Sequence, residues 1–180
     1  MTFNYYTKNQ VDEIVKAMTI LVDTREKVNE HILEYFDKKK IQFKEKALES
    51  GDYSVMIPTC PELGFALPQT LNKPIDGGLF IERKNSLEEL AGNLGKNRDR
   101  FEAEMQRMKN AEKHLIIESG SWADIMLGQY DSGVGAKAFY NSLLTFQTRY
   151  NLHIHFTAPK YSGCLIKGIC ENKIKEVFQL

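Results

Sequence analysis

Short apolar runs that end directly in charged residues, and that alternate with stretches of helical periodicity, are the feature that most constrains this chain. Residues 19–22 (Thr-Ile-Leu-Val) run into Asp23, and residues 79–81 (Leu-Phe-Ile) run into Glu82. Such runs predict buried strands that deliver polar side chains at their carboxyl ends. The same criteria predict strands at residues 41–47, 53–57, 114–118 and 152–156. The alternation predicts the α/β class, with helices around one sheet.

Apolar residues at helical spacing predict the helices between these strands. The expected helices lie at residues 11–18, 28–40, from 86 to a break at 92–95, around 101–108, at 139–150 and after Pro159. We expect residues 1–18 to be an N-terminal lead-in and residues 19–180 to form one domain. Four prolines and a Gly-Gly pair mark residues 58–78 as a long, mobile loop that joins the two strands of a hairpin.

The charge balance limits the classes of partner. Lys and Arg together number 24, as do Asp and Glu, so the formal net charge of the 180-residue chain is +0 at pH 7. A protein that simply coats nucleic acid or an anionic membrane should be basic overall. Any contact of this chain with phosphate therefore has to be made by a local patch.

The N-terminus and the cysteines indicate the compartment. The three cysteines are odd in number and lack metal-ligand spacing, which is typical of reduced thiols in an intracellular protein. No basic start followed by an apolar run is present at the N-terminus, and no stretch approaches the ~20 apolar residues of a membrane span. We expect a soluble, cytoplasmic protein that does not contact the membrane.

Acidic residues from two distant segments are expected to meet in the hairpin. Because side chains on a strand alternate between faces, Glu82 and Lys84 share one face and Arg83 points to the other. Asp52 stands at the start of the partner strand. Antiparallel pairing across the hairpin would bring Asp52 alongside Glu82, with the residues between them looped out.

Two carboxylates and an ammonium that converge in this way favour metal chemistry. Asp52 and Glu82 would repel each other unless a divalent cation lies between them, and hard oxygen ligands favour Mg²⁺ or Mn²⁺. Such a metal makes its bound water more acidic, and Lys84 beside it could hold or deprotonate that water. Asp23 adds a third carboxylate at another strand end, and Glu26 follows it by three residues. This set is typical of a metal-dependent phosphodiesterase.

The same residues, taken in order, carry a family resemblance. The quoted segments are 22–26 (Val-Asp-Thr-Arg-Glu), 51–53 (Gly-Asp-Tyr) and 82–84 (Glu-Arg-Lys), with further matches at 100–102, 115–118 and 121–122. Together they resemble the nuclease domain of the XPF family of structure-specific DNA endonucleases over residues 19–156. That family's pattern is Gly-Asp, a gap, and Glu-Arg-Lys followed after three residues by Asp. The chain resembles a stand-alone nuclease domain of the kind found in bacteria and phages.

The resemblance implies a restriction-endonuclease-like α/β/α core with a central mixed sheet. It also implies metal-dependent cleavage of branched or flapped DNA by in-line hydrolysis, carried out by a homodimer. The roles that it implies are Asp23, Asp52 and Glu82 as metal ligands, Lys84 to position the water, and Glu26 and Arg83 as further residues of the catalytic motif. The chain departs from the family in its extended 58–78 loop, in lacking a helix-hairpin-helix module, and in having Glu88 where the family has its final aspartate.

Several of these residues also have simpler interpretations. Asp23 could cap the helix that follows it, and Glu88 lies in a first helical turn, where the helix dipole favours acids. Arg83 could form an ion pair at the surface or behind the site. The ordered set of acids favours the ligand interpretation for Asp23, whereas capping and function stay equally open for Glu88.

Four basic residues are candidates for contact with DNA. Lys96, Arg100 and Arg107 are expected on one flank of the helix near residues 101–108, and Arg25 belongs to the first motif. Arg100 also matches the family pattern, which favours a contact with the DNA backbone or the scissile phosphate. For Lys96 and Arg107, a solvated helix face paired with acids is the favoured interpretation.

Two histidines could be mistaken for a metal site. His153 and His155 lie two apart on an expected strand and therefore share a face. The sequence provides no evident third ligand, since His114 and His31 lie far away along the chain. We expect a structural role for both residues.

Two other functions remain open. The chain could be a non-catalytic DNA-binding or dimer-partner module of the same fold, although the retained acids and lysine favour catalysis. It could also be a junction-resolving or restriction-type nuclease that shares the core. We expect a homodimer, with spare apolar surface on the helices at residues 139–150 and 165–178.

Overall fold

The computed structural model describes residues 6–178 of the chain. Its elements, in chain order, are α1 (Lys8–Ala17), β1 (Thr19–Val22), α2 (Glu30–Lys39), β2 (Phe43–Glu45), β3 (Tyr53–Ile57), the short helix η1 (Pro61–Leu63), β4 (Gln69–Thr70), β5 (Leu79–Lys84), α3 (Leu87–Leu94), α4 (Arg98–Arg107), β6 (Glu112–Ile117), α5 (Trp122–Leu127), α6 (Ala136–Tyr150), β7 (Leu152–Phe156) and α7 (Pro159–Phe178).

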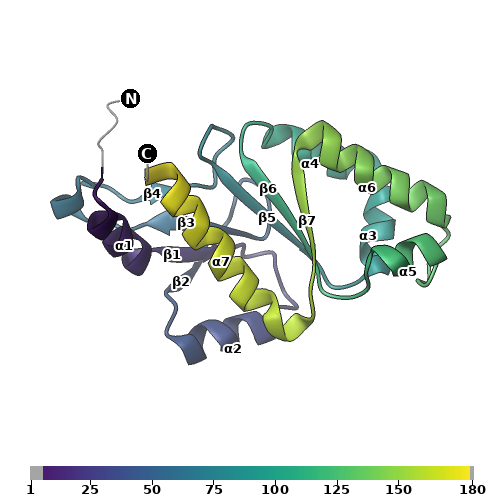
Figure 1. The fold of residues 1–180 in the computed structure, drawn as a ribbon, viewed down its shortest axis with the longest axis horizontal. Helices are drawn as coiled ribbons and strands as arrows, with labels where there is room; N and C mark the ends of the chain where they lie inside the picture. The colour runs from purple at the N-terminus through teal and green to yellow at the C-terminus, as the bar shows by residue number, and fades with distance from the viewer. Residues whose placement is uncertain (1–5, 179–180) are drawn as a thin grey trace.

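One mixed sheet runs through the middle of the molecule (Figure 1). Its seven strands have the order β2-β1-β3-β5-β6-β7, with β4 paired to β3 beside this path. The β1–β2, β5–β6 and β6–β7 pairs are parallel, whereas β3 is antiparallel to β1, β4 and β5. The hairpin of β3 and β5 lies at the centre, so the residues at its open end lie between the two halves of the sheet.

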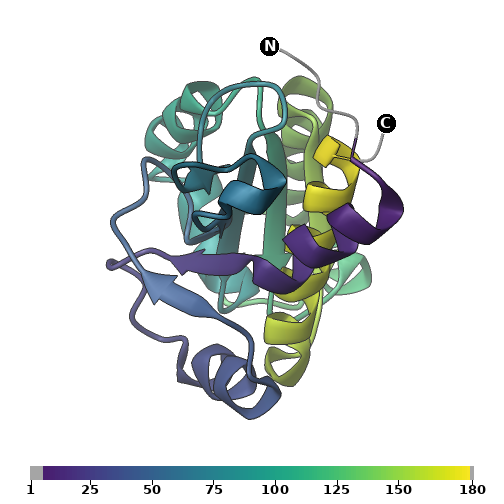
Figure 2. The same ribbon diagram turned by 90° about the vertical axis from the view of Figure 1, so that its left-hand side faces the viewer.

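Helices cover both faces of this sheet (Figures 1 and 2). One apolar core joins the sheet to α1, α2 and α7 and includes Phe36, Tyr53 and Ile166. A second core joins the opposite face to α3–α6 and includes Phe101 and Phe139. This α/β/α architecture with a central mixed sheet confirms the predicted fold class.

Alternation along β5 decides which face each polar side chain reaches. Ile81 belongs to the core under α2 and α7, and Phe80 belongs to the core under α3–α6. Since side chains alternate on a strand, Glu82 and Lys84 point to the same face as Phe80, and Arg83 points to the face of Ile81. The predicted division between these three residues is therefore confirmed.

The start of α2 differs from the predicted one. Val28 lies outside α2 and is 60% exposed, because Asn29 takes the N-cap position and the helix begins at Glu30. Apolar spacing alone placed this boundary, and it does not identify the residue at which backbone hydrogen bonding starts. The break between α3 and α4 comes at Gly95, within the predicted range 92–95.

Residues 58–78 connect β3 to β5, as predicted, but this connection contains secondary structure of its own. They contain η1 and β4, and the backbones of Cys60 and Phe65 form a bridge. Phe65 and Leu71 are buried in the core beside α7. The mobility of this segment stays a prediction.

The N-terminal helix contributes to the same core as α7. Ile14 of α1 is fully buried, and α1 lies against α7 (Figure 2). Residues 1–5 of the predicted lead-in lie outside the described residues. Among residues 6–178, no helix combines the length and apolar character that crossing a membrane requires.

Candidate active site

Three acids end neighbouring strands on the same face of the sheet. Val22 of β1 pairs with Tyr53 of β3, and Tyr53 pairs with Ile81 of β5. Each of the three paired residues is followed or preceded by one of the acids, which are Asp23, Asp52 and Glu82. The acids lie on the α4 side of the sheet. The Asp23 amide donates to the Asp52 carbonyl at 2.8 Å, and the Asp52 amide donates to the Ile81 carbonyl at 2.8 Å. The predicted approach of Asp52 to Glu82 is therefore present in the structure.

Glu82 and Lys84 form a buried ion pair at the end of β5. The Lys84 Nζ lies 2.6 Å from Glu82 Oε1, and both side chains are 8% exposed. Burial raises the pKa of Glu82, although Lys84 opposes this shift. Burial alone would lower the pKa of Lys84, but the carboxylates of Glu82 and Asp52 outweigh it and raise the pKa above its usual value. Lys84 is therefore an ammonium at neutral pH.

The Asp52 carboxylate has an environment that opposes its charge. Its Oδ2 accepts a hydrogen bond from the Arg83 amide at 2.8 Å, which fixes it against β5. Burial, followed by repulsion from Glu82, raises the pKa of Asp52 well above its usual range. Gly51 precedes it with a φ of +76°, and a Cβ at Gly51 would lie 2.8 Å from the Phe80 ring. The turn that places Asp52 thus requires glycine on two grounds.

Asp23 belongs to the same row, but its carboxylate is already paired. Arg25 donates to both of its oxygens at 2.8 Å, and the Leu48 amide donates to Oδ2 at 2.8 Å. Burial acts to raise the pKa of Asp23, but these hydrogen bonds outweigh it and lower the pKa below its usual value. Asp23 does not cap a helix, because α2 begins at Glu30 with Asn29 as its N-cap.

Arg83 lies behind this row, on the α2 face. Its guanidinium, 2% exposed, pairs with Glu26 and lies 2.6 Å from Glu118 Oε2. It also donates to the Val28 carbonyl at 2.7 Å, and His31 Nε2 lies 2.7 Å from Glu118 Oε1. Arg83 and Glu26 therefore form an ion pair behind the end of β5, on the face of the sheet opposite Glu82. Glu118 and His31 were missed as members of this network, although Glu118 closes one of the matched segments.

Of the two neighbouring acids on α3, Glu89 approaches the site and Glu88 points away from it. Glu89 Oε1 lies 3.5 Å from Lys84 Nζ, and its Oε2 accepts from the Asn85 amide at 2.9 Å. Glu88 is exposed and accepts from the Asp131 amide at 3.1 Å, on the loop between α5 and α6. Of the two roles left open for Glu88, this placement favours the local one. A further acid, Glu104 of α4, lies close enough to act on the charge of Glu82.

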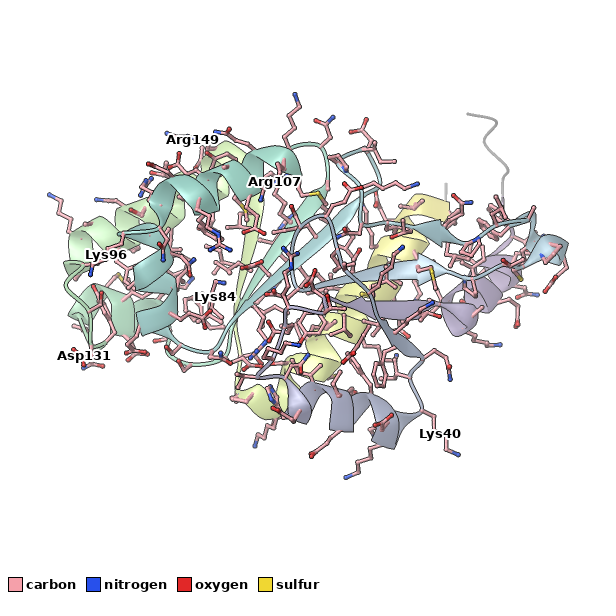
Figure 3. The ribbon with its side chains drawn as sticks, turned by 180° about the vertical axis from the view of Figure 1, so that it is seen from behind. Lys40, Lys84, Lys96, Arg107, Asp131 and Arg149 are labelled. Carbon is pink, nitrogen blue, oxygen red and sulfur yellow. The ribbon has the colours of Figure 1, made fainter. Side chains whose placement is uncertain are left out.

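The four candidate DNA contacts are all exposed. Arg25 is 65% exposed despite its pairing with Asp23. Arg100 and Arg107 are exposed on α4, where their spacing relative to Glu104 places all three on one flank. Lys96 lies in the turn before α4 and not on the helix flank that was predicted. Figure 3 shows Lys96 and Arg107 well apart on the side of the molecule that also displays Lys84.

The donor set fits a hard divalent cation in part. Asp52 and Glu82 could offer carboxylate oxygens whose mutual repulsion a cation would relieve, and oxygen ligands suit Mg²⁺ or Mn²⁺. Asp23 stands next in the row but is engaged by Arg25. Within residues 6–178, no group of three or more His, Cys, Asp or Glu side chains is arranged to hold a metal ion. The structure thus brings together two of the three predicted ligands.

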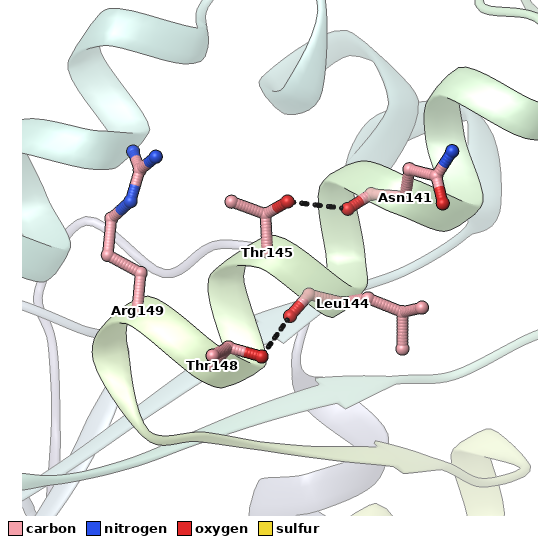
Figure 4. Close-up of a pocket in the computed structure, with 5 residues that line it drawn as sticks. All are labelled: Asn141, Leu144, Thr145, Thr148 and Arg149. Atoms are coloured by element: carbon pink, nitrogen blue, oxygen red, sulfur yellow. Dashed lines mark hydrogen bonds between the residues drawn. The ribbon is translucent and has the colours of Figure 1, made fainter.

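A surface hollow elsewhere in the molecule carries no such chemistry. It lies on the outer side of α6 and is lined by Asn141, Leu144, Thr145, Thr148 and Arg149 (Figure 4). The two threonine hydroxyls donate back to carbonyls of the same helix, at 2.8 and 3.0 Å. With its threonine hydroxyls engaged within the helix and no acid among its lining residues, the hollow is not a candidate active site.

Comparison with known proteins places this geometry in a family. The ERCC4 domain model matches residues 22–166. The structure is similar to XPF from Aeropyrum pernix, with a TM-score of 0.59 and 18% identity over 86% of this chain and 60% of that one. It is also similar to XPF from Aeropyrum pernix in complex with DNA, with a TM-score of 0.58 and 20% identity over 88% and 66% of the two chains.

These similarities differ in what they establish. At such identities the two structures show a shared fold, which agrees with the predicted nuclease-type α/β/α core. The chain spans less than two thirds of the length of either one. No curated protein matches the sequence significantly.

Proposed function

The chain belongs to the ERCC4 domain family, and from this premise we propose that it is a metal-dependent DNA endonuclease. Its membership confirms the resemblance that the ordered motifs predicted. The proposed reaction is in-line hydrolysis of a phosphodiester in branched or flapped DNA. The observation that carries the proposal is the half-buried Asp52, held against β5 and close enough to feel the charges of the buried pair Glu82 and Lys84.

The proposed cofactor is Mg²⁺ or Mn²⁺, held by Asp52 and Glu82. When bound, such a cation neutralises charge on the scissile phosphate and acidifies a coordinated water. Asp23 would join these ligands if Arg25 released it, for example to a DNA phosphate. That exchange is consistent with the exposure of Arg25 and gives this arginine a role in DNA binding.

Lys84 is proposed to hold the attacking water or a phosphate oxygen by donating hydrogen bonds. Its pKa, raised by Glu82 and Asp52 against the effect of burial, keeps the side chain protonated at neutral pH. An ammonium donates but does not accept, so of the two roles that the sequence left open for Lys84, this one fits the structure better. Arg83 and Glu26 would position the end of β5 from behind.

DNA is the proposed macromolecular partner. A structure with the same fold, XPF from Aeropyrum pernix, is in complex with DNA. The exposed positions of Arg25, Lys96, Arg100 and Arg107 are consistent with contacts to a phosphate backbone. Because the net charge of the chain is +0, these local contacts would have to supply the electrostatic attraction.

We also propose a homodimer, whose interface differs in part from the predicted one. Residues 165–178 of α7 do not form the spare apolar face that was expected, because Ile166, Ile169 and Ile174 are buried against the sheet. Exposed apolar side chains lie on α5 and α6, where Leu127 is 70% and Leu144 is 39% exposed. Sedimentation equilibrium of the wild type and of Leu144→Glu tests this proposal, and a monomeric wild type would contradict it.

A cleavage panel tests the function. Labelled flap, fork, four-way junction, linear duplex and single-stranded DNA are incubated with the protein in Mg²⁺, in Mn²⁺ and in EDTA. We expect cleavage near the branch point in either metal and none in EDTA. Asp52→Asn and Lys84→Met should each lower the rate by about 100-fold or more. Asp37→Asn and Lys38→Met, matched changes at exposed positions of α2, should cleave like the wild type.

Other results of this panel would support the rival functions. Tight binding of forked DNA without cleavage in any metal would identify a non-catalytic binding module. Symmetric cutting of four-way junctions, or cutting at one duplex sequence, would identify a junction-resolving or restriction-type nuclease. Cleavage that persists in both active-site variants would refute the assignment of the site.

A further inference from the structure

Two lysines of β2 lie on the same face of the sheet as Asp23, which we call the acid face. Val22 of β1 points into the core under α2 and α7, so Asp23 points to the opposite face. Glu45 of β2 pairs with Val22 in parallel register and shares its face. Because side chains alternate along a strand, the two neighbours of Glu45, Lys44 and Lys46, lie on the acid face.

Lys46 extends the row of acids by one strand. Its amide donates to the Val22 carbonyl at 2.9 Å, which continues the β1–β2 ladder beyond the last paired residues. Lys46 therefore stands beside Asp23, the residue that follows Val22. Along this edge of the sheet the order is Lys46, Asp23, Asp52 and Glu82. Neighbouring strands are about 4.8 Å apart, so the backbones of Lys46 and Glu82 are about 14 Å apart along the row.

The helices of the acid face pack on the other end of the sheet. Within residues 6–178, the apolar core under α3–α6 takes its strand residues from β5, β6 and β7, and none from β1 or β2. Lys44 and Lys46 are exposed, and β2 is an edge strand. In Figure 3, Lys40, which precedes β2, and Lys96, in the turn before α4, lie on opposite sides of Lys84. The β2 strand and the α3–α4 turn thus flank the acids on two sides.

The positive charge of this segment is not balanced by acids. Residues 38–46 contain five lysines and one acid, although the chain as a whole has a net charge of +0. That acid, Glu45, points to the other face of the sheet. Among residues 6–178, no ion pair includes Lys44 or Lys46. The two lysines therefore give this end of the row an uncompensated positive charge.

We propose that Lys44 and Lys46 bind phosphates of the DNA backbone, on the side of the acids away from Lys96. The inference rests on the proposed nuclease function and adds the path of its substrate. An ammonium binds phosphate as a point charge, and such contacts position a nucleic acid without reading its sequence. The backbone then runs along the row, with the scissile phosphate at Asp52 and Glu82. About four nucleotides span the distance from Glu82 to Lys46, since each nucleotide of a duplex strand rises about 3.4 Å.

A simpler role for these lysines is the protection of an edge strand. Exposed lysines on an edge discourage pairing with a strand of another molecule. That role requires no contact with DNA, so it predicts that removal of both charges leaves DNA binding unchanged. Binding of phosphate predicts weaker binding and a smaller dependence of the affinity on salt.

The test is fluorescence anisotropy of a labelled flap DNA with the full chain in EDTA, over a series of KCl concentrations. The slope of log affinity against log salt should be smaller in magnitude by about 1.8 in Lys44→Met/Lys46→Met, because each lost phosphate contact removes about 0.9. The affinity of this variant at about 50 mM KCl should fall by about 10-fold or more, equally for flaps of different sequence. Lys44→Arg/Lys46→Arg, which keeps both charges, should bind like the wild type.

The matched control is Lys38→Met/Lys39→Met, which removes two charges from α2 on the opposite face and should keep the wild-type slope. Melting curves verify that each variant is folded, and Lys46→Met alone, with an expected decrease of about 0.9, decides if the double variant is not. The proposal is overturned if the wild type does not bind DNA, if Lys44→Met/Lys46→Met keeps the wild-type slope and affinity, or if the control loses as much. A wild type that shows the expected binding but cleaves no DNA would support this surface and contradict the nuclease function alone.

Discussion

Replacing Arg83 with methionine tests whether the network behind the acids supports the fold. The Arg83 guanidinium is 2% exposed and contacts the carboxylates of Glu26 and Glu118, of which Glu118 is 3% exposed. Methionine fills most of the same volume but leaves Glu118 as a buried charge with only His31 beside it. Removing one partner of a buried ion pair typically costs about 3–5 kcal/mol, because the other charge stays in the protein without compensation.

This magnitude is large against the stability of a whole domain. Unfolding free energies of about 5–15 kcal/mol are usual, so Arg83→Met should remove a substantial part of the total. For a chain of this size, about 2–4 °C of melting temperature correspond to each kcal/mol, which gives an expected decrease of about 6–20 °C. The surface variant Arg149→Met is the matched control, because Arg149 is 54% exposed and lies 3.6 Å from Glu102. Its cost should stay under about 1 kcal/mol.

Urea unfolding of five proteins, the Arg149→Met control among them, measures these losses. The wild type, Arg83→Met, Glu118→Leu and the double variant form a cycle in which the double variant should recover part of the loss, because it removes both buried charges. If Arg83→Met unfolds within about 1 kcal/mol of the wild type, or if the two single losses simply add, the network does not have the role that its geometry indicates.

Three further outcomes follow from the geometry of the acids. Gly51→Ala should destabilise the protein by about 2 kcal/mol or more in urea unfolding, because the added Cβ meets the Phe80 ring in a left-handed backbone; unchanged stability would refute the steric argument. Asp52→Asn should be more stable than the metal-free wild type at pH 7. Because folding raises the pKa of Asp52, the wild type has added folding stability below the unfolded-state pKa, and it loses that stability as pH rises through the folded-state pKa. The stability advantage of Asp52→Asn over the wild type should therefore be smaller at pH 4 than at pH 7. A larger advantage at pH 4 would contradict this reasoning. Lys84→Met should lower kcat far more than it raises KM for DNA in steady-state cleavage, and the reverse pattern would make Lys84 a binding residue.

The parts of the site that follow from strand periodicity could be predicted from the sequence. Alternation placed Glu82 and Lys84 on one face and Arg83 on the other, and apolar runs located β1, β3 and β5. The approach of Asp52 to Glu82 followed from hairpin pairing. These features depend on local pattern and on one short-range topology, and both are encoded in consecutive residues.

The contacts that the sequence did not reveal depend on the packing of separate segments or on small rotations. Glu88 and Glu89 differ by one position on a helix, which is about 100° of rotation, and this decides which of them reaches Lys84. The pairing of Asp23 with Arg25 is completed by the amide of Leu48, a residue from another segment. The contact of Glu118 with Arg83 requires the parallel register of β5 and β6. No periodicity in the sequence specifies these contacts.

The proposed nuclease activity depends most directly on whether Asp52 and Glu82 bind one hard cation between them. Electron paramagnetic resonance of free Mn²⁺ during titration of the protein, with uncleavable phosphorothioate DNA present, measures this binding without relying on catalysis. We expect the wild type to take up Mn²⁺ at this site, with an affinity about 10-fold or more weaker in both Asp52→Asn and Glu82→Gln and unchanged in Asp37→Asn. Equal Mn²⁺ uptake by all four proteins would contradict the account.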